Sequence, residues 1–106
     1  NADYNRIKQV LINIIKNSIE ASNLNSSIDI TCFTNKNLNI IIKDYGQGMD
    51  EETINNLFKP FYTTKEKGTG LGICLSKEII EAHKGKIYYS SIFSKGTTVK
   101  IVLPNN

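Results

Sequence analysis

The beginning of the chain carries a helical pattern of apolar residues. From Asp3 to Ala21, apolar side chains recur at steps of three and four positions, as on one face of an amphipathic helix. They are Ile7, Val10, Leu11, Ile14, Ile15 and Ile19. Asp3 belongs to the residue types that cap helix N-termini. The pattern predicts a helix over Asp3 to Ala21, with Asp3 as its cap.

Two further regions alternate between apolar and polar positions, which predicts two β-hairpins. Residues 28–32 alternate in this way, and after a turn at 35–37 a second strand runs over 38–43. Residues 87–93 and 97–103 repeat the arrangement around the tight turn Ser94-Lys95-Gly96.

Two more helices are expected between the hairpins. Asp50 is the N-cap of a short helix that runs to about Leu57, and residues 58–70 look irregular. A long helix follows from about Leu71 to Lys84, with Gly85 as its stop signal. Its apolar face is predicted to hold Leu71, Cys74, Leu75, Ile79 and Ala82. Helices on one face of a mixed or antiparallel sheet follow, which is an α+β two-layer sandwich.

Length and composition fit one globular domain over residues 1–106. The chain has 106 residues, 40% of them hydrophobic, and only two prolines. It begins at Asn1 without the layout of a signal peptide, so we expect a fragment of a longer protein. No apolar run approaches the roughly 18 residues of a membrane span.

The net charge and the number of cysteines exclude few classes of function. Thirteen basic and ten acidic side chains give a net charge of +3, and the excess of lysine lies in the second half. Such a surface is only a weak indication of a phosphate-bearing ligand, because lysine-rich surfaces are usually solvated faces. Cys32 and Cys74 are too few and too separated for a disulfide scaffold or a zinc cluster. We expect both to be small apolar core residues.

Asn13 and Asn17 are the first candidates for chemistry. At a spacing of i, i+4 they lie side by side on the predicted helix, away from the apolar stripe. Two amide oxygens so arranged can ligate a hard cation such as Mg²⁺. The alternative is two polar residues on a wet face.

The second candidate is the run Asp44-Tyr45-Gly46-Gln47-Gly48, directly after an apolar strand. An aspartate at a strand end, followed by glycines that permit close backbone approach, can accept a hydrogen bond from an exocyclic amine. That chemistry fits an adenine. A plain Asp and Gly turn is the alternative.

The third candidate is Gly68-Thr69-Gly70-Leu71-Gly72, at the predicted start of the second long helix. Unhindered backbone N–H groups at a helix N-terminus bind anions, so phosphates are expected there. The run is not a Rossmann fingerprint, because a loop rather than a strand precedes it. The chain also lacks the P-loop pattern.

The fourth candidate is the stretch from Phe58 to Lys65, whose aromatics include Phe58 and Phe61. Aromatic side chains in a glycine-flanked loop suggest a lid over a ligand, and Lys65 could reach a phosphate. The alternative is a small apolar cluster under a loop. Near the end of the chain, the hydroxyl of Thr97 or Thr98 could join a base-binding network.

Taken in this order, the four segments resemble the motifs of sensor histidine kinases. The run from Gln9 to Ala21 is similar to their N box, and Asp44-x-Gly46-x-Gly48 is similar to their G1 box. Phe58-Lys59-Pro60-Phe61 resembles the F box, and the glycine run from Gly68 to Gly72 resembles the G2 box. The resemblance covers essentially the whole chain. It implies an ATP-binding catalytic domain of the Bergerat fold, shared with DNA gyrase, Hsp90 and MutL.

The resemblance also implies roles for single residues. Asn17 would be the Mg²⁺ ligand with Asn13 as its partner, and Asp44 would bind the adenine amino group beside Gly46 and Gly48. Thr97 would assist Asp44 through a water molecule. Phosphates would lie on the glycine run, and the lid, about residues 49–70, would be anchored by its aromatics. The implied nucleotide-contacting residues of the run and the lid are Gly68, Thr69, Gly70, Leu71, Gly72, Phe58, Phe61 and Lys65.

Partners follow from the same resemblance. The domain would donate the γ-phosphate of Mg-ATP to a histidine on a separate dimerisation and phospho-acceptor domain of the same protein, with a response regulator downstream. The only histidine here, His83, is interpreted as a helix-capping or surface residue. We expect no nucleic-acid partner and no direct membrane contact. We also expect a monomeric fragment of a homodimeric protein, in the cytoplasm or in the cytoplasmic part of a membrane-bound sensor.

Two alternative functions remain open at this point. The first is an ATPase of the same fold, although such enzymes resemble this chain with a glutamate general base in place of Asn13. The second is an interaction module that has lost nucleotide binding, which the complete set of asparagine, aspartate and glycine residues disfavours.

Overall fold

The computed structural model describes residues 4–22, 26–59 and 72–104. In chain order the elements are α1 (Tyr4–Ala21), β1 (Ile28–Thr34), β2 (Asn37–Asp44), α2 (Glu51–Asn55), α3 (Gly72–Ala82), β3 (Lys86–Ile92) and β4 (Gly96–Pro104). Both predicted hairpins and all three predicted helices are present, with small shifts at their ends. The predicted cap Asp3 lies outside the described residues. No helix among the described residues is long and apolar enough to cross a membrane.

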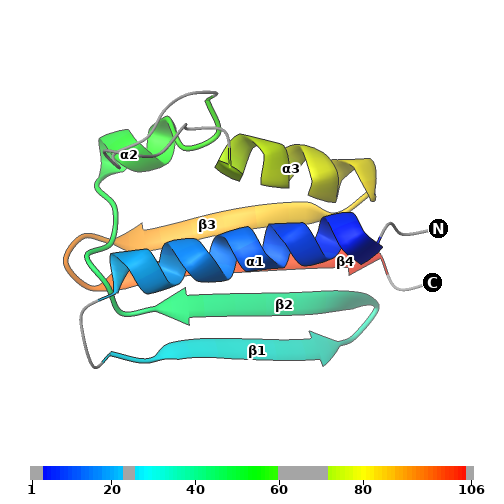
Figure 1. Cartoon of the computed structure of the whole chain (residues 1–106), viewed down its shortest axis with the longest axis horizontal. Coiled ribbons are helices and arrows are strands. Elements are labelled where there is room, and N and C mark those ends of the chain that lie inside the picture. Colours follow the sequence, from blue (N-terminus) through cyan, green and yellow to red (C-terminus); the bar gives the residue numbers. More distant parts are fainter. Residues whose placement is uncertain (1–3, 23–25, 60–71, 105–106) are drawn as a thin grey trace.

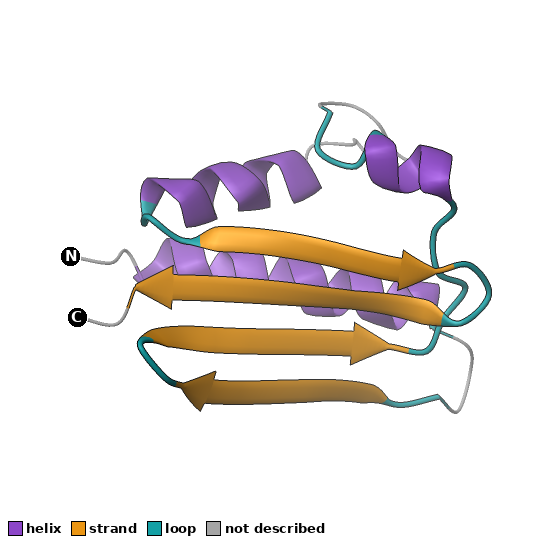
Figure 2. Cartoon of the chain, turned by 180° about the vertical axis from the view of Figure 1, so that it is seen from behind, coloured by secondary structure: helices purple, strands orange, loops and turns teal. Residues whose placement is uncertain are grey.

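The strands form one antiparallel sheet in the order β1-β2-β4-β3. The two hairpins join at the centre, where β2 pairs with β4 and Ile42 lies opposite Val99. Helices α1 and α3 cover one face of this sheet (Figure 1), and the view from behind shows a face without any helix (Figure 2). The predicted α+β two-layer architecture is therefore confirmed.

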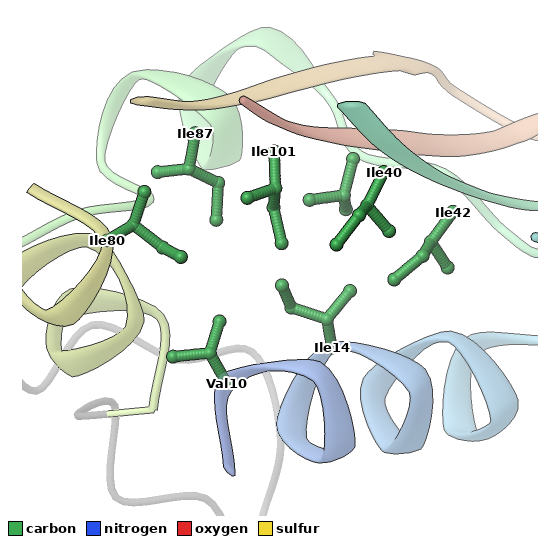
Figure 3. Close-up of a cluster of buried hydrophobic side chains, with 8 residues drawn as sticks. Val10, Ile14, Ile40, Ile42, Ile80, Ile87 and Ile101 are labelled. Atoms are coloured by element: carbon green, nitrogen blue, oxygen red, sulfur yellow. The ribbon is translucent and has the colours of Figure 1, made fainter. Parts of the chain in front are cut away.

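The core lies between the two helices and the central strands. Val10 and Ile14 of α1 and Ile80 of α3 point toward strand residues that include Ile42 and Ile101 (Figure 3). Each of these five side chains is at most 2% exposed. Burying one such side chain stabilises a fold by roughly 1.5–3 kcal/mol relative to leaving it in water. This core fixes α1 and α3 side by side on the sheet.

The buried face of α3 differs from the predicted one. Ile80 and Ser76 are buried, whereas Leu75, expected in the core, is 48% exposed. The helix is apolar on more than one side, and its packing against α1 and β3 selects the face that is buried. The spacing of apolar residues predicted the helix correctly and its orientation wrongly.

The end of α3 gives Gly85 a role other than the expected one. Lys84, with φ of 62°, adopts the left-handed conformation, while Gly85 donates its N–H to the Ile80 carbonyl at 2.9 Å. A side chain at Gly85 would collide with the carbonyl oxygen of Val102 and with Leu103. Glycine is therefore needed here so that the chain can pass close to β4.

The expectation that both cysteines are core residues is wrong. Cys32 is exposed and Cys74 is half-buried. Cys32 lies on the edge strand β1, whose residues from Asp29 to Thr34 are all exposed because neither α1 nor α3 reaches over them. The edge position of the strand, which the local pattern does not reveal, decides this exposure.

Candidate nucleotide-binding site

Asp44 is the central side chain of the candidate site. It is the last residue of β2, and it is only 3% exposed. Its Oδ1 accepts two hydrogen bonds, from the backbone N–H of Gly46 at 3.0 Å and from that of Thr97 at 3.2 Å. The carboxylate is thereby held where β2, the following glycine loop and β4 meet. Two donors on one oxygen fix the orientation of the whole group.

The second oxygen of Asp44 remains available to a ligand. Oδ2 accepts no hydrogen bond from the described residues. Every fully buried side-chain oxygen of these residues has a hydrogen-bond partner, so an oxygen without a partner is not fully buried. Oδ2 is therefore reached by solvent, although the residue as a whole is buried. A buried carboxylate with one oxygen fixed and one open is a directional acceptor for an N–H group.

The glycine loop after Asp44 requires glycine at two positions. A side chain at Gly46 would overlap the carbonyl group of Ala21 at the end of α1. Gly48 has φ of 69°, and a side chain there would overlap the carbonyl group of Ile92. The two glycines let the loop lie directly against α1 and β3. This close packing holds the loop beside Asp44, and the contact of Gly46 and Gly48 to an adenine base stays a prediction.

Hydrogen bonds fasten the same loop on both sides. Gln47 donates its N–H to the Ala21 carbonyl at 3.2 Å, and its own carbonyl accepts the N–H of Ser94 at 2.6 Å. The loop thus joins the end of α1 to the β3–β4 turn. The end of α1, the end of β2 and the start of β4 lie together at the left of Figure 1.

Ser91 supports the site, and sequence reasoning missed it. Its hydroxyl donates to the Gly96 carbonyl at 2.9 Å, accepts the N–H of Met49 at 2.7 Å and lies 2.9 Å from the Thr97 hydroxyl. The available signal was its position in β3, because Ser91 falls on the helix-facing side of an alternating strand. A polar residue on that side needs partners.

Thr97 contacts Asp44 through its main chain, and the expected contact through a water molecule stays a prediction. Its backbone N–H reaches Asp44 directly, and its hydroxyl is paired with Ser91. The main chain at the start of β4 therefore orients Asp44, and the side chain ties β4 to β3.

Asn13 and Asn17 lie one turn apart on α1, and both are half-buried. They flank the buried row of Val10, Ile14 and Ser18. Asn13 Oδ1 accepts a 3.3 Å hydrogen bond from Gln9. Asn17 lies one turn before Ala21, whose carbonyl holds the glycine loop, so it belongs to the same end of the fold as Asp44. The two amides lie one turn apart, as the spacing predicted, but they border the buried row and do not lie away from it; their contact to magnesium stays a prediction.

Phe58 anchors the segment after α2 to the rest of the domain. Its ring packs edge to face on Tyr89 with centroids 5.7 Å apart, and the ammonium of Lys77 lies 4.6 Å from its centroid. These contacts attach the start of the expected lid to β3 and α3. Burial raises the pKa of the Tyr89 phenol, which therefore stays protonated at physiological pH. Asp50 precedes α2 as its N-cap, as predicted, and its carboxylate accepts the N–H of Thr53 at 2.8 Å.

Several predicted site residues lie outside the described residues. They are Phe61, Lys65, Gly68, Thr69, Gly70 and Leu71. Gly72, the last glycine of the predicted phosphate-binding run, is the first residue of α3. The expected phosphate contacts of these residues stay predictions.

His83 lies just after α3, at the end remote from Gly72. Its ring nitrogen Nδ1 lies 2.8 Å from the carbonyl oxygen of Ile79 in the last turn of the helix. This contact agrees with the interpretation of His83 as a helix-capping residue.

Comparison with known proteins assigns the family. The model of the family described as histidine kinase-, DNA gyrase B-, and HSP90-like ATPase matches residues 2–106. Sporulation kinase A of Bacillus subtilis (strain 168) is 43% identical over 105 residues, which cover 98% of this chain and 17% of that protein. Signal transduction histidine-protein kinase AtoS of Escherichia coli (strain K12) is 41% identical over 108 residues, which cover 100% of this chain and 18% of that protein. The chain thus spans less than a quarter of the length of either relative.

A solved structure gives the same result for the fold. The catalytic domain of histidine kinase ThkA superposes with a TM-score of 0.84 at 39% identity, covering 97% of this chain and 68% of that one. The antiparallel sheet and its helices are therefore those of a known catalytic domain. The chain belongs to the family of histidine kinase-, DNA gyrase B- and HSP90-like ATPases, as a catalytic domain of the histidine kinase type.

Proposed function

We propose that the domain binds Mg-ATP and donates the γ-phosphate to a histidine on another domain of the same protein. The observation that carries this proposal is Asp44, buried at the end of β2 with Oδ1 held by two backbone N–H groups and Oδ2 open. Family membership supports nucleotide binding, and the transfer step is the further inference.

Asp44 would recognise the adenine base. Its open oxygen can accept a hydrogen bond from the exocyclic amine of adenine, whereas guanine presents a carbonyl oxygen at the corresponding position. Two facing oxygens repel each other, and a buried acceptor left without its donor costs about 1–3 kcal/mol. The fixed orientation of Asp44 therefore favours ATP over GTP.

The polyphosphate would lie toward α1 and the start of α3. Asn17, with Asn13 one turn earlier, would hold magnesium through amide oxygens, which suits the preference of this ion for oxygen ligands. Magnesium would neutralise phosphate charge when bound. Gly72 begins α3, whose N-terminal N–H groups favour negative charge. The chain would thus contribute positioning and charge compensation, the main requirements of phosphoryl transfer.

The acceptor histidine would come from outside this chain. His83 is the only histidine, and it lies eleven positions after Gly72. At 1.5 Å per residue this is about 16 Å along the helix, and its ring nitrogen already contacts the Ile79 carbonyl. A phospho-acceptor domain in the longer protein, followed by a response regulator, completes the proposed pathway.

The competing function is an ATPase of the same fold. Hydrolysis requires a base that activates water, and the amide of Asn13 cannot accept that proton. We therefore expect slow phosphate release by the isolated domain.

Calorimetric titration with ATP and GTP, with and without magnesium, tests this proposal together with a phosphate-release assay. We expect magnesium-assisted binding of ATP over GTP with negligible turnover. Radiolabel from γ-labelled ATP should appear on the full-length protein and not on this chain alone. Rapid turnover would favour the ATPase, and the absence of binding by folded protein would favour an interaction module.

A further inference from the structure

A hollow lies on the face of the sheet that no described helix covers. It has a volume of about 300 Å³, and it is lined by Lys43, Asp44, Tyr45, Ser90, Ser91, Ile92, Lys95, Gly96 and Thr98. This face is turned toward the viewer in Figure 2. The hollow lies at the end of the sheet where the β3–β4 turn meets the end of β2.

Asp44 and Ser91 border both this hollow and the proposed nucleotide site, but the strand register turns their side chains away from the hollow. Thr98 of β4 lies opposite both Lys43 of β2 and Ser90 of β3, so these three residues form one row across the sheet. The neighbouring row, which contains Asp44 and Ser91, faces the helices. Because adjacent residues of a strand point to opposite faces, the row of Thr98 points away from the nucleotide site.

Contacts on the open face orient two of the lining side chains. The ammonium of Lys43 lies 5.0 Å from the centroid of the Tyr45 ring. The Tyr45 hydroxyl donates a 2.6 Å hydrogen bond to the carboxylate of Asp29, the residue opposite Lys43 on β1. These two contacts therefore hold the Tyr45 ring at one side of the hollow. Two acidic residues lie at this region. The carboxylate of Asp29 accepts the phenol, and Asp44 borders the hollow while its Oδ1 accepts the N–H groups of Gly46 and Thr97.

The other polar side chains that face the hollow from the open side of the sheet are donors without partners. Among the described residues, no hydrogen bond or ion pair involves the ammonium of Lys95 or the hydroxyls of Ser90 and Thr98. Two ammonium groups and two hydroxyls favour an anionic oxygen group. The Ile92 side chain and the Tyr45 ring add apolar surface beside them, which favours a ligand with an apolar part.

We propose that this hollow binds a small organic anion, in which a carboxylate or phosphate group is attached to an apolar ring or chain. The anionic group contacts Lys43 and Lys95, and the apolar part packs on Tyr45 and Ile92. The site lies back to back with Asp44, and it requires no nucleotide.

Two probes, benzoate and phenyl phosphate, test the site in the wild-type chain by NMR titration. We expect saturable binding of at least one probe, with intermolecular NOEs from its ring protons to the Tyr45 ring and the Ile92 methyl groups. Tighter binding of benzoate would identify a carboxylate ligand, and tighter binding of phenyl phosphate a phosphate ligand. NOEs to residues of the nucleotide site instead, or no saturable binding of either probe, would overturn the proposal.

A matched pair of double variants tests the role of the two lysines. Lys43→Ala with Lys95→Ala should weaken probe binding at least fivefold. Lys86→Ala with Lys100→Ala removes the same charge from exposed positions outside the lining, and should change affinity less than twofold. Equal losses in the two variants would show attraction to the general positive charge of the face and would overturn the proposal. Neither experiment contains ATP, so failure here is distinguishable from failure of the proposed function.

Discussion

The backbone N–H of Thr97 donates a 3.2 Å hydrogen bond to Oδ1 of Asp44, across 53 positions of sequence. This bond joins the start of β4 to the end of β2 and orients the side chain on which adenine recognition is proposed to depend. The Gly46 N–H completes the arrangement from the other side. Asp44 therefore connects the stability of this end of the domain with ligand selectivity.

Asp44→Asn tests that connection. An asparagine whose oxygen keeps the N–H groups of Gly46 and Thr97 turns its NH₂ group toward the base, so a donor faces the donor amine of adenine. We expect ATP affinity to fall about tenfold or more and discrimination against GTP to be lost, by calorimetry. Loss of charge-assisted bonds should lower the free energy of unfolding by about 1–3 kcal/mol. Unchanged selectivity would contradict the adenine assignment.

Asn17→Ala should remove the magnesium-dependent part of ATP binding. Its amide oxygen is the proposed ligand, and alanine offers no replacement. Affinity measured with magnesium should fall about tenfold, while the weaker affinity in EDTA stays the same. Asn5→Ala, an exposed substitution on the same helix, is the control and should leave both values unaltered. Equal losses with and without magnesium would contradict the assignment.

Gly48→Ala should destabilise the domain by about 2 kcal/mol or more. Its φ of 69° disfavours any side chain, and a Cβ atom would overlap the carbonyl group of Ile92. Urea unfolding followed by circular dichroism measures the loss. Lys84→Gly is the comparison variant, and the opposite effect on stability is expected. Lys84 has φ of 62°, a conformation that glycine adopts more readily than lysine. We expect that variant to be more stable than wild type by about 0.5–1 kcal/mol.

Ser91→Ala should be more costly than its neighbour Ser90→Ala. The Ser91 hydroxyl contacts Met49, Gly96 and Thr97, so its removal leaves polar groups of the loop and of β4 without a partner. We expect a loss of about 1–3 kcal/mol in the free energy of unfolding. Ser90 is exposed on the opposite face, and its substitution should change stability by less than about 0.5 kcal/mol. Similar losses for the two variants would argue against a role of Ser91 in bracing the site.

Tyr45 provides a prediction about pH. Its hydrogen bond to the Asp29 carboxylate, helped by partial burial and by the negative charge of Asp29, raises the pKa of the phenol above its usual value of 10.0. The protonated phenol is the form that the fold favours. Its contribution to stability is therefore fully present below pH 10 and is lost as the pH rises through the raised pKa. NMR titration of the labelled Tyr45 ring measures this value.

Asp29→Asn is the control for Tyr45. It removes the charge and the strong acceptor, so the pKa of Tyr45 should move back toward 10.0. The alkaline loss of stability that Tyr45 causes should then become smaller than in the wild-type chain, because the pKa values of the folded and unfolded states become more nearly equal. An unaltered pKa would contradict the assigned cause.

The sequence by itself determined the elements of this protein and their order. Periods of three to four positions and of two positions arise from backbone geometry, so the local pattern identified α1 and both hairpins. The motif around Asp44 identified the strand end and the glycine loop, and the four segments taken together identified the family. Local chemistry also identified Asp50 as the cap of α2.

Only the tertiary structure decided which residues are buried and which groups bond to each other. Leu75 and Ile80 are both apolar, and the packing of α3 on α1 and β3 buries only the second. Cys32 is exposed because β1 is an edge strand beyond the reach of α1. The bonds from Thr97 to Asp44 and from Ser91 to Met49 join residues 53 and 42 positions apart. Burial and long-range hydrogen bonds depend on residues that come into contact only when the helices pack on the sheet. The local sequence pattern therefore does not predict them.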